Sequence, residues 1–148
     1  ERGMRSGTLA THQIVGLGKA AELAVQALPQ EEARLSALKA ALINGLTPLS
    51  GVLINGDQGV ANIANISFAD VDGESLLLSL HDLAVSSGSA CNSATMAPSY
   101  VLKAIGLDDE LAHASIRFSM GRFTTEDDIN QAVASVTTAV QRLRAMTA

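Results

Sequence analysis

The sequence predicts an α/β fold, in which a small mixed sheet is covered by helices on one face and preceded by a long helical stretch. Apolar residues recur at three- and four-residue steps near both ends of the chain, which is the period of an amphipathic helix. The middle of the chain holds short runs in which apolar and polar residues alternate, as in half-buried strands. A chain of 148 residues, 47% of them hydrophobic, is long enough to bury one such core.

Two helices are expected first. From Thr11 the helical period continues until Pro29, which lacks a backbone N–H and is expected to end the helix. Glu31 and Glu32 favour the start of a second helix, where the helix dipole is positive, and Gly45 is expected to end it. The apolar stripes are Ile14, Leu17, Ala21, Val25 and Leu28 in the first helix, and Leu35, Leu38 and Leu42 in the second.

Strand patterns follow these helices. The run VLIN (52–55) ends in an Asn-Gly turn signal, and the run ANIANISFAD (61–70) alternates so that Ala64, Ile66 and Phe68 share a face. The run GESLLLSLHDL (73–83) is too densely apolar for a one-sided strand. It predicts a short buried helix, with a brief strand to follow around Val85.

The last third of the sequence predicts a helix, a strand and a long helix. Pro98 suits the first position of a helix over SYVLKAIG (99–106). In ASIRFSMG (114–121) the apolar residues alternate with Arg117, which places this arginine on the polar face of a strand. Thr124 or Thr125 caps the final helix, with Asp127 or Asp128 completing a capping box, and its apolar stripe is Ile129, Val133, Val136, Val140 and Leu143.

The charge of the chain excludes some classes of partner. A formal net charge of -5 without a basic stripe argues against nucleic acid or an anionic membrane surface as the main partner. No apolar segment is long enough to span a bilayer, and a single cysteine fits a reducing compartment, so a cytoplasmic protein is expected. The opening ERGMRSGT reads as the middle of a loop, and we expect the chain to be part of a longer protein.

Cys91 is the only cysteine of the chain. A lone cysteine is most often a small buried hydrophobe. Its neighbours in SSGSACNSAT (86–95), however, offer little apolar surface and much backbone freedom, which suits a solvent-reachable reactive thiol. Composition alone leaves both interpretations open.

Two further features contain groups suited to bind an anion. Arg117 is either an ordinary solvated residue or a planar fork, held by a strand, that binds a carboxylate. The motif RSGT (5–8) lies just ahead of a helix, where backbone N–H groups and the Thr8 hydroxyl would suit a phosphate, although a plain N-capping loop fits as well. The three histidines lie far apart in sequence, so a Cys/His hydrolase has no local motif here, and no metal site is expected.

Four stretches resemble the C-terminal part of the cysteine desulfurases of iron–sulfur cluster assembly, which are pyridoxal-phosphate enzymes of the class V aminotransferase family. They run in register over nearly the whole chain, and their sequences are ERGMRSGTLATHQIVG, AVSSGSAC, PSYVLKAIGL and DELAHASIRFSMGRFTTEDDI. The resemblance implies that residues 29–148 form the small C-terminal domain of fold type I pyridoxal-phosphate enzymes. Residues 1–28 are then a loop and long helix that link it to a large domain outside this chain.

The resemblance also implies roles for single residues. Cys91 matches the catalytic cysteine that attacks the sulfur of L-cysteine, becomes a persulfide and leaves alanine as product. Arg117 matches the arginine that binds the substrate carboxylate. Thr8 matches the threonine that reaches the cofactor phosphate of the neighbouring subunit in a homodimer, and iron–sulfur scaffold proteins are the implied sulfur acceptors.

The same resemblance implies that this chain alone does not turn over cysteine. The cofactor needs a Schiff-base lysine, which the family carries in the large domain, and none of Lys19, Lys39 and Lys103 resembles that motif. Two rival interpretations stay open. One is a stand-alone sulfur-carrier or partner-binding module without cofactor, and the other is an inert thiol domain that serves as a scaffold surface.

Overall fold

The computed structural model describes residue 3 and residues 6–56, 59–87 and 98–147. A long helix, α1 (Thr11–Leu46), leads into strands β1 (Val52–Asn55) and β2 (Ile63–Phe68). Helix α2 (Gly73–Ser79) and the two-residue strand β3 (Ser86–Ser87) follow. The last part holds helices α3 (Tyr100–Ala104) and α4 (Asp109–His113), strand β4 (Ser115–Ser119) and helix α5 (Glu126–Thr147).

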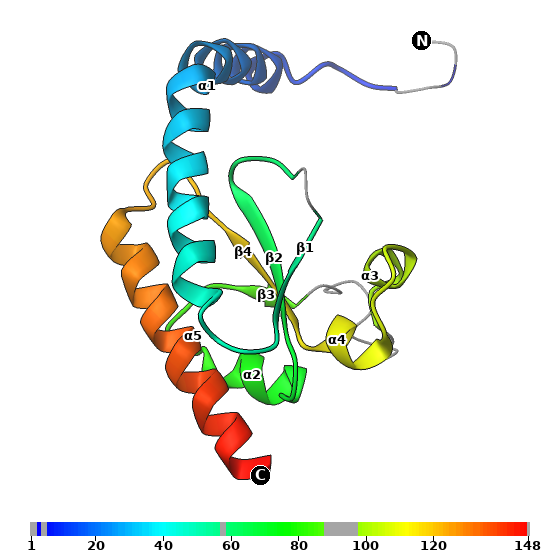
Figure 1. Cartoon of the computed structure of the whole chain (residues 1–148). Helices are drawn as coiled ribbons and strands as arrows, with labels where there is room; N and C mark the ends of the chain where they lie inside the picture. Colours follow the sequence, from blue (N-terminus) through cyan, green and yellow to red (C-terminus); the bar gives the residue numbers. More distant parts are fainter. Residues whose placement is uncertain (1–2, 4–5, 57–58, 88–97, 148) are drawn as a thin grey trace.

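The four strands form one sheet in the order β1-β2-β4-β3. Helices α1 and α5 lie side by side against one side of this sheet, while α3 and α4 lie on the other side (Figure 1). The expected α/β fold and its helix-covered face are therefore present. The sheet differs from the expected mixed sheet in one respect, because each of its strand pairs is antiparallel. Strands β2 and β3 run the same way, but β4 lies between them and opposes both.

The core fills the space between the sheet and the two long helices. The strand residues that alternate toward it are buried, as the pattern predicted. They meet the leucine stripe of α1 and the valine stripe of α5, which also brings Ala132 and Ala139 into the core. Among the largest buried side chains are Leu42, Leu46, Ile66, Phe68, Leu76, Leu80, Ile116, Val136 and Val140.

Pro29 does not end the first helix, contrary to the sequence prediction. It lies inside α1, which runs unbroken to Leu46. A proline in a helix interior costs about 3 kcal/mol, but the second half of α1 buries four leucines, each worth about 1.5–3 kcal/mol, and this burial outweighs the cost. The helix is bent between its first and second parts (Figure 1), as a missing hydrogen bond at proline explains.

Gly45 is a packing residue rather than the helix stop that the sequence suggested. The helix continues past it, and a Cβ atom at Gly45 would lie 2.7 Å from a methyl carbon of Val133 on α5. Glycine therefore lets α1 and α5 approach each other closely. The end of α1 is set one residue later, where the Thr47 N–H still donates to the Ile43 carbonyl at 2.9 Å.

The start of α3 and the presence of α4 differ from the sequence prediction for the last third of the chain. Pro98 precedes α3 by two residues, and Ser99 is the N-cap. The short helix α4 had no periodic pattern to predict it, although Asp108 caps it by accepting a hydrogen bond from the Leu111 N–H at 2.8 Å. The capping box of α5 is confirmed: the Thr125 N–H donates to Asp128, and the Asp128 N–H donates to the Thr125 hydroxyl. Among the helices in the described ranges, none combines the length and hydrophobicity needed to cross a bilayer.

Candidate functional site

A row of polar residues crosses the sheet on the face turned away from α1 and α5. Asn55 on β1 is directly opposite Asn65 on β2, Asn65 is directly opposite Arg117 on β4, and Arg117 is directly opposite Ser86 on β3. Residues paired in this way point to the same face, and their Cβ atoms lie about 5 Å apart. The row therefore brings together four side chains from four strands, among them the arginine that the sequence singled out.

Hydrogen bonds tie the β1 end of this row to the interior. The Asn55 Nδ2 donates to Asn65 Oδ1 at 2.6 Å and to Ser67 Oγ at 2.7 Å. The hydroxyls of Ser67 and Ser115 are 2.7 Å apart, and Ser115 donates to the Leu111 carbonyl at 2.7 Å. Both serines are fully buried, because α4 covers this end of the otherwise polar face. Asn55 Oδ1 is buried without a hydrogen-bond partner in the described part of the chain.

Arg117 differs from the other arginines in the described ranges. It is exposed, and it makes no hydrogen bond or ion pair with the residues that the structure describes. The others each have a partner: Arg34 donates to three carbonyls near Thr124, Arg122 pairs with Glu31, Arg142 donates to Ser79, and Arg144 donates to the Ala69 carbonyl. An arginine fixed on a strand with its donors unused is suited to bind an anion, and a carboxylate matches its planar fork.

The predicted site residues are only partly brought together. Ser86, which is paired with Arg117, is followed by the last described residue of that stretch, Ser87. Cys91 lies outside the described residues. Thr8 precedes α1, in a segment that runs away from the sheet (Figure 1), so this chain does not place Thr8 beside Arg117.

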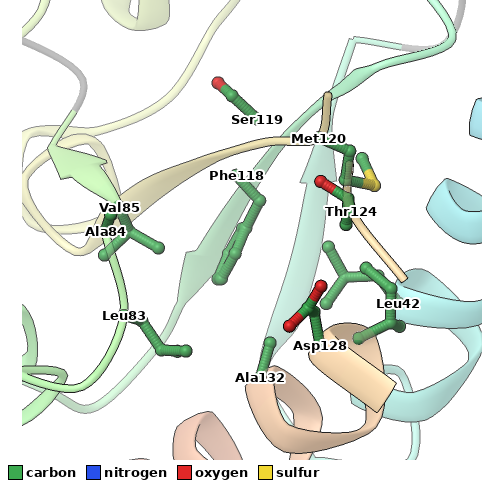
Figure 2. Close-up of a pocket in the computed structure, with 11 residues that line it drawn as sticks. Leu42, Leu83, Ala84, Val85, Phe118, Ser119, Met120, Thr124, Asp128 and Ala132 are labelled. Carbon is green, nitrogen blue, oxygen red and sulfur yellow. The ribbon is translucent and has the colours of Figure 1, made fainter. Parts of the chain in front are cut away.

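A separate apolar pocket of about 250 Å³ opens on the helix side of the sheet. Figure 2 shows the ring of Phe118 between Leu83 on one side and Leu42 and Ala132 on the other. Two of its polar side chains are already engaged, since Thr124 accepts from the Gly121 N–H and Asp128 from the Thr125 N–H. The Thr125 N–H, together with the Thr125 hydroxyl, lowers the pKa of Asp128. This pocket offers packing surface and no unused charged group.

Other titratable residues do not gather into a second site. Within the described ranges, no three His, Cys, Asp or Glu side chains are grouped as they would be around a metal ion. The three histidines are exposed, and His81 lies beside Asp82, with Nε2 and Oδ1 3.4 Å apart. Each lysine amine has a partner: Lys19 contacts Glu22, Lys39 donates to the Val60 carbonyl, and Lys103 pairs with Asp109.

Comparison with known proteins identifies the family. A family model described as aminotransferase class-V matches residues 1–132, which is most of the chain. The chain belongs to the class V aminotransferase family. It is 60% identical over 148 residues to a cysteine desulfurase IscS of Photobacterium profundum and 56% identical over 148 residues to one of Shewanella frigidimarina. Each match covers 99% of this chain and 37% of the relative's length.

Solved structures of NifS-like proteins have a similar fold. A NifS-like protein from Rickettsia africae has a TM-score of 0.80 and 27% sequence identity, over 93% of this chain and 36% of that chain. A second NifS-like protein has a TM-score of 0.78 and 29% identity, over 96% of this chain and 36% of that chain. A protein named SspA, whose structure is described as a complex with cysteine, is 28% identical, with a TM-score of 0.55 over 83% of this chain.

The asparagines of the polar row were not recognised as site residues from the sequence. Both lie in runs that predicted strands, and Asn65 has the same alternating phase as Ser67. That phase is the signal that would have placed them on the polar face. The sequence contains no comparable signal for the pairing of Asn65 with Arg117, which are 52 positions apart in sequence and meet only through the strand register.

Proposed function

We propose that this chain is the C-terminal, sulfur-handling part of a pyridoxal-phosphate-dependent cysteine desulfurase, which converts L-cysteine to L-alanine and transfers the sulfur as a persulfide. The observation that carries the proposal is the guanidinium of Arg117, which has no partner among the described residues. It lies on a central strand, directly opposite Ser86, a few positions before Cys91 in the sequence. The names of the relatives support the same activity for the longer protein.

In this proposal Arg117 binds the carboxylate of L-cysteine. The strand fixes the direction of the side chain, and a planar guanidinium forms two parallel hydrogen bonds to a carboxylate. The pairing of Arg117 with Ser86 supports this role, because Cys91 follows Ser86 closely in the sequence. Ser87 and Cys91 are separated by four peptide units, so the chain places their Cα atoms at most about 14 Å apart.

Cys91 is the proposed nucleophile. Its thiolate attacks the sulfur of L-cysteine, and an S–S bond forms while the C–S bond of the substrate breaks. The electron pair of that C–S bond goes to the carbon, which takes up a proton to give alanine. The Cys91 persulfide then passes its outer sulfur to a thiolate of an acceptor protein, with an iron–sulfur scaffold protein as the proposed acceptor.

The residues of this chain do not by themselves fit a covalently bound pyridoxal phosphate. Every lysine amine of the chain lies at the surface and contacts a carboxylate or a backbone carbonyl. None is therefore a buried amine that could form a Schiff base with the cofactor aldehyde. When bound, the cofactor supplies the electron sink for this chemistry. We place its lysine in the remainder of the longer protein, and we assign to Thr8 a hydrogen bond to the cofactor phosphate of the neighbouring subunit in a homodimer. This chain alone is proposed to be inactive.

The proposed domain boundary falls within α1, with residues 1–28 linking to a large domain and residues 29–148 forming the small domain. Burial supports this division, because residues 11–26 are all exposed whereas the leucines after Pro29 enter the core. Large apolar side chains such as Leu17 and Val25 are each 72% exposed here. A surface of this kind is suited to pack against the remainder of the longer protein.

The test uses the full-length protein that contains this chain, loaded with pyridoxal phosphate. Cys91→Ser should keep the cofactor absorbance and abolish sulfide release. Arg117→Ala should keep the cofactor and raise the KM for L-cysteine at least about 30-fold, the effect of losing a charge-assisted pair. The matched control is Arg142→Ala, which removes an exposed arginine that contacts Ser79 on α2 and should leave the KM unchanged.

Two outcomes would contradict the proposal. Sulfide release by Cys91→Ser at the original rate would remove the role of the thiol, and an unchanged KM in Arg117→Ala would remove the role of the guanidinium. A full-length protein that binds no pyridoxal phosphate yet accepts sulfur on Cys91 would favour the sulfur-carrier module instead. A native Cys91 that resists both alkylation and persulfidation would favour the inert scaffold.

A further inference from the structure

The buried hydroxyls beside the polar row fix the orientation of the Asn55 amide. A serine hydroxyl has one hydrogen to donate. Ser115 donates its hydrogen to the Leu111 carbonyl at 2.7 Å, so the hydrogen in the 2.7 Å contact between Ser67 and Ser115 belongs to Ser67. Ser67 can then only accept from Asn55, which requires the amide nitrogen at that contact of 2.7 Å.

The orientation of Asn55 determines which atom Asn65 presents. The amide nitrogen of Asn55 also faces Asn65 at 2.6 Å, so the Asn65 atom at this contact is the oxygen, Oδ1. With both amides reversed, Ser67 would have to donate to Asn55, and two hydroxyl oxygens 2.7 Å apart would have no hydrogen between them. The Asn65 Nδ2 is consequently the donor left over, and no partner for it occurs among the residues that the structure describes.

This leftover donor lies next to Arg117. The two residues are paired directly across β2 and β4, on the same face, with Cβ atoms about 5 Å apart. A guanidinium has five N–H donors and no acceptor, so it cannot accept the hydrogen of the Asn65 amide. Two neighbouring groups that only donate favour a ligand that only accepts, and an ionised carboxylate with two oxygens is such a ligand.

We propose that the Asn65 Nδ2 is a second donor to the substrate carboxylate and that the hydrogen-bonded chain of Asn55, Ser67 and Ser115 orients it. This inference rests on the proposed function, in which Arg117 binds the carboxylate of L-cysteine. Asn65 donates to one carboxylate oxygen while the guanidinium binds the other. The pair selects substrates that carry an α-carboxylate over amines that lack one.

The decisive variant is Asn65→Asp in the full-length enzyme loaded with pyridoxal phosphate. It keeps an oxygen to accept the Asn55 hydrogen bond, and it replaces the Nδ2 donor by an oxygen that repels the substrate carboxylate and competes with it for the neighbouring Arg117. The KM for L-cysteine should rise about 10-fold or more, the loss expected for a hydrogen bond to a charged group. The matched control, Asn130→Asp on the exposed face of α5, makes the same chemical change away from the row and should leave the KM unchanged. Asn65→Ala is the uncharged second variant, with a rise in the same direction.

Inhibition by two small probes separates a contact with the carboxylate from a general change of structure. L-alanine carries the carboxylate and ethylamine does not. Asn65→Ala, which removes the donor without adding a charge, should weaken inhibition by L-alanine about 10-fold and leave inhibition by ethylamine unchanged. If the variant weakens inhibition by both probes equally, or weakens inhibition by neither, the proposal for Asn65 is overturned. A raised KM in Arg117→Ala with a normal KM in both Asn65 variants would overturn it while the proposed function stands. An unchanged KM in Arg117→Ala would overturn both.

Discussion

Replacing Ser115 by alanine tests the buried hydroxyl chain most directly, because Ser115 is both an acceptor and a donor there. The change leaves the Ser67 hydrogen and the Leu111 carbonyl without their partners, in a place where both serines are fully buried. Each buried group left without a partner costs about 1–3 kcal/mol. We therefore expect the free energy of unfolding to fall by roughly 2–4 kcal/mol, with the smaller value applying where the carbonyl regains a water.

Ser67→Ala should cost less, at about 1–2 kcal/mol, since Ser115 keeps its hydrogen bond to Leu111 and the Asn55 amide keeps a longer contact of 3.4 Å to the Ser115 hydroxyl oxygen. The double variant should cost about 1 kcal/mol less than the sum of the two, because it leaves no serine hydrogen without an acceptor. The assay is equilibrium urea unfolding of the holoprotein and the three variants, compared at equal m-values. Losses of unfolding free energy that simply add in the double variant would refute the proposed direction of the hydrogen bond from Ser67 to Ser115, and with it the orientation of Asn65. A larger loss for Ser67→Ala than for Ser115→Ala would do the same.

Further predictions concern the turns and caps that hold the site. Gly73→Ala should destabilise the protein by at least about 1–3 kcal/mol in thermal unfolding, because a Cβ atom there would lie 2.0 Å from the His113 carbonyl oxygen, just ahead of β4. The control Gly18→Ala, a helix position with no atom within 4 Å, should be neutral or stabilise by up to about 1 kcal/mol, and an equal loss in both would contradict the contact. Asp72→Ala should cost about 1 kcal/mol at pH 7 through loss of the α2 N-cap. Hydrogen bonds from the Ser75 hydroxyl and N–H lower the pKa of Asp72 in the folded protein. The stability difference between the wild type and Asp72→Ala should therefore persist above pH 3.8, the ordinary pKa, and vanish as the pH falls through the lower folded-state pKa. A stability difference that grows in acid would contradict this assignment.

Much of the fold was predictable because local patterns decide it. The alternation in residues 63–68 and 115–119 predicted that the apolar side chains Ala64, Ile66, Phe68, Ile116 and Phe118 are buried, and the final helix followed from its apolar stripe and its capping box. The prediction that Pro29 ends the first helix was wrong. The local rule predicts a break at proline, whereas the leucines that follow pack the helix against strands that lie later in the sequence. The short helix α4 is held by its Asp108 cap and its packing rather than by periodicity.

The site was predictable only in part, for a physical reason. Strand phase places Arg117 on a polar face, but its neighbours depend on pairing register, which local sequence does not determine. Ser115 has the same phase as Arg117, and the sequence placed it on the polar face. The structure buries it fully, because α4 covers that end of the sheet. The role expected for Cys91 stays a prediction, since it lies outside the described residues.

The strand order also has a consequence for the time course of folding. In the sheet, β3 is paired only with β4, a strand that follows it by nearly thirty residues and takes the place beside β2. During synthesis β3 therefore has no partner until β4 has left the ribosome, and its two residues are too few to form structure alone. The pairing of β3 with β4 is therefore a late, long-range event, and its loop-closure cost slows such pairings. The β3 edge of the sheet is consequently among the last parts to be assembled, whereas the hairpin of β1 and β2 can form earlier.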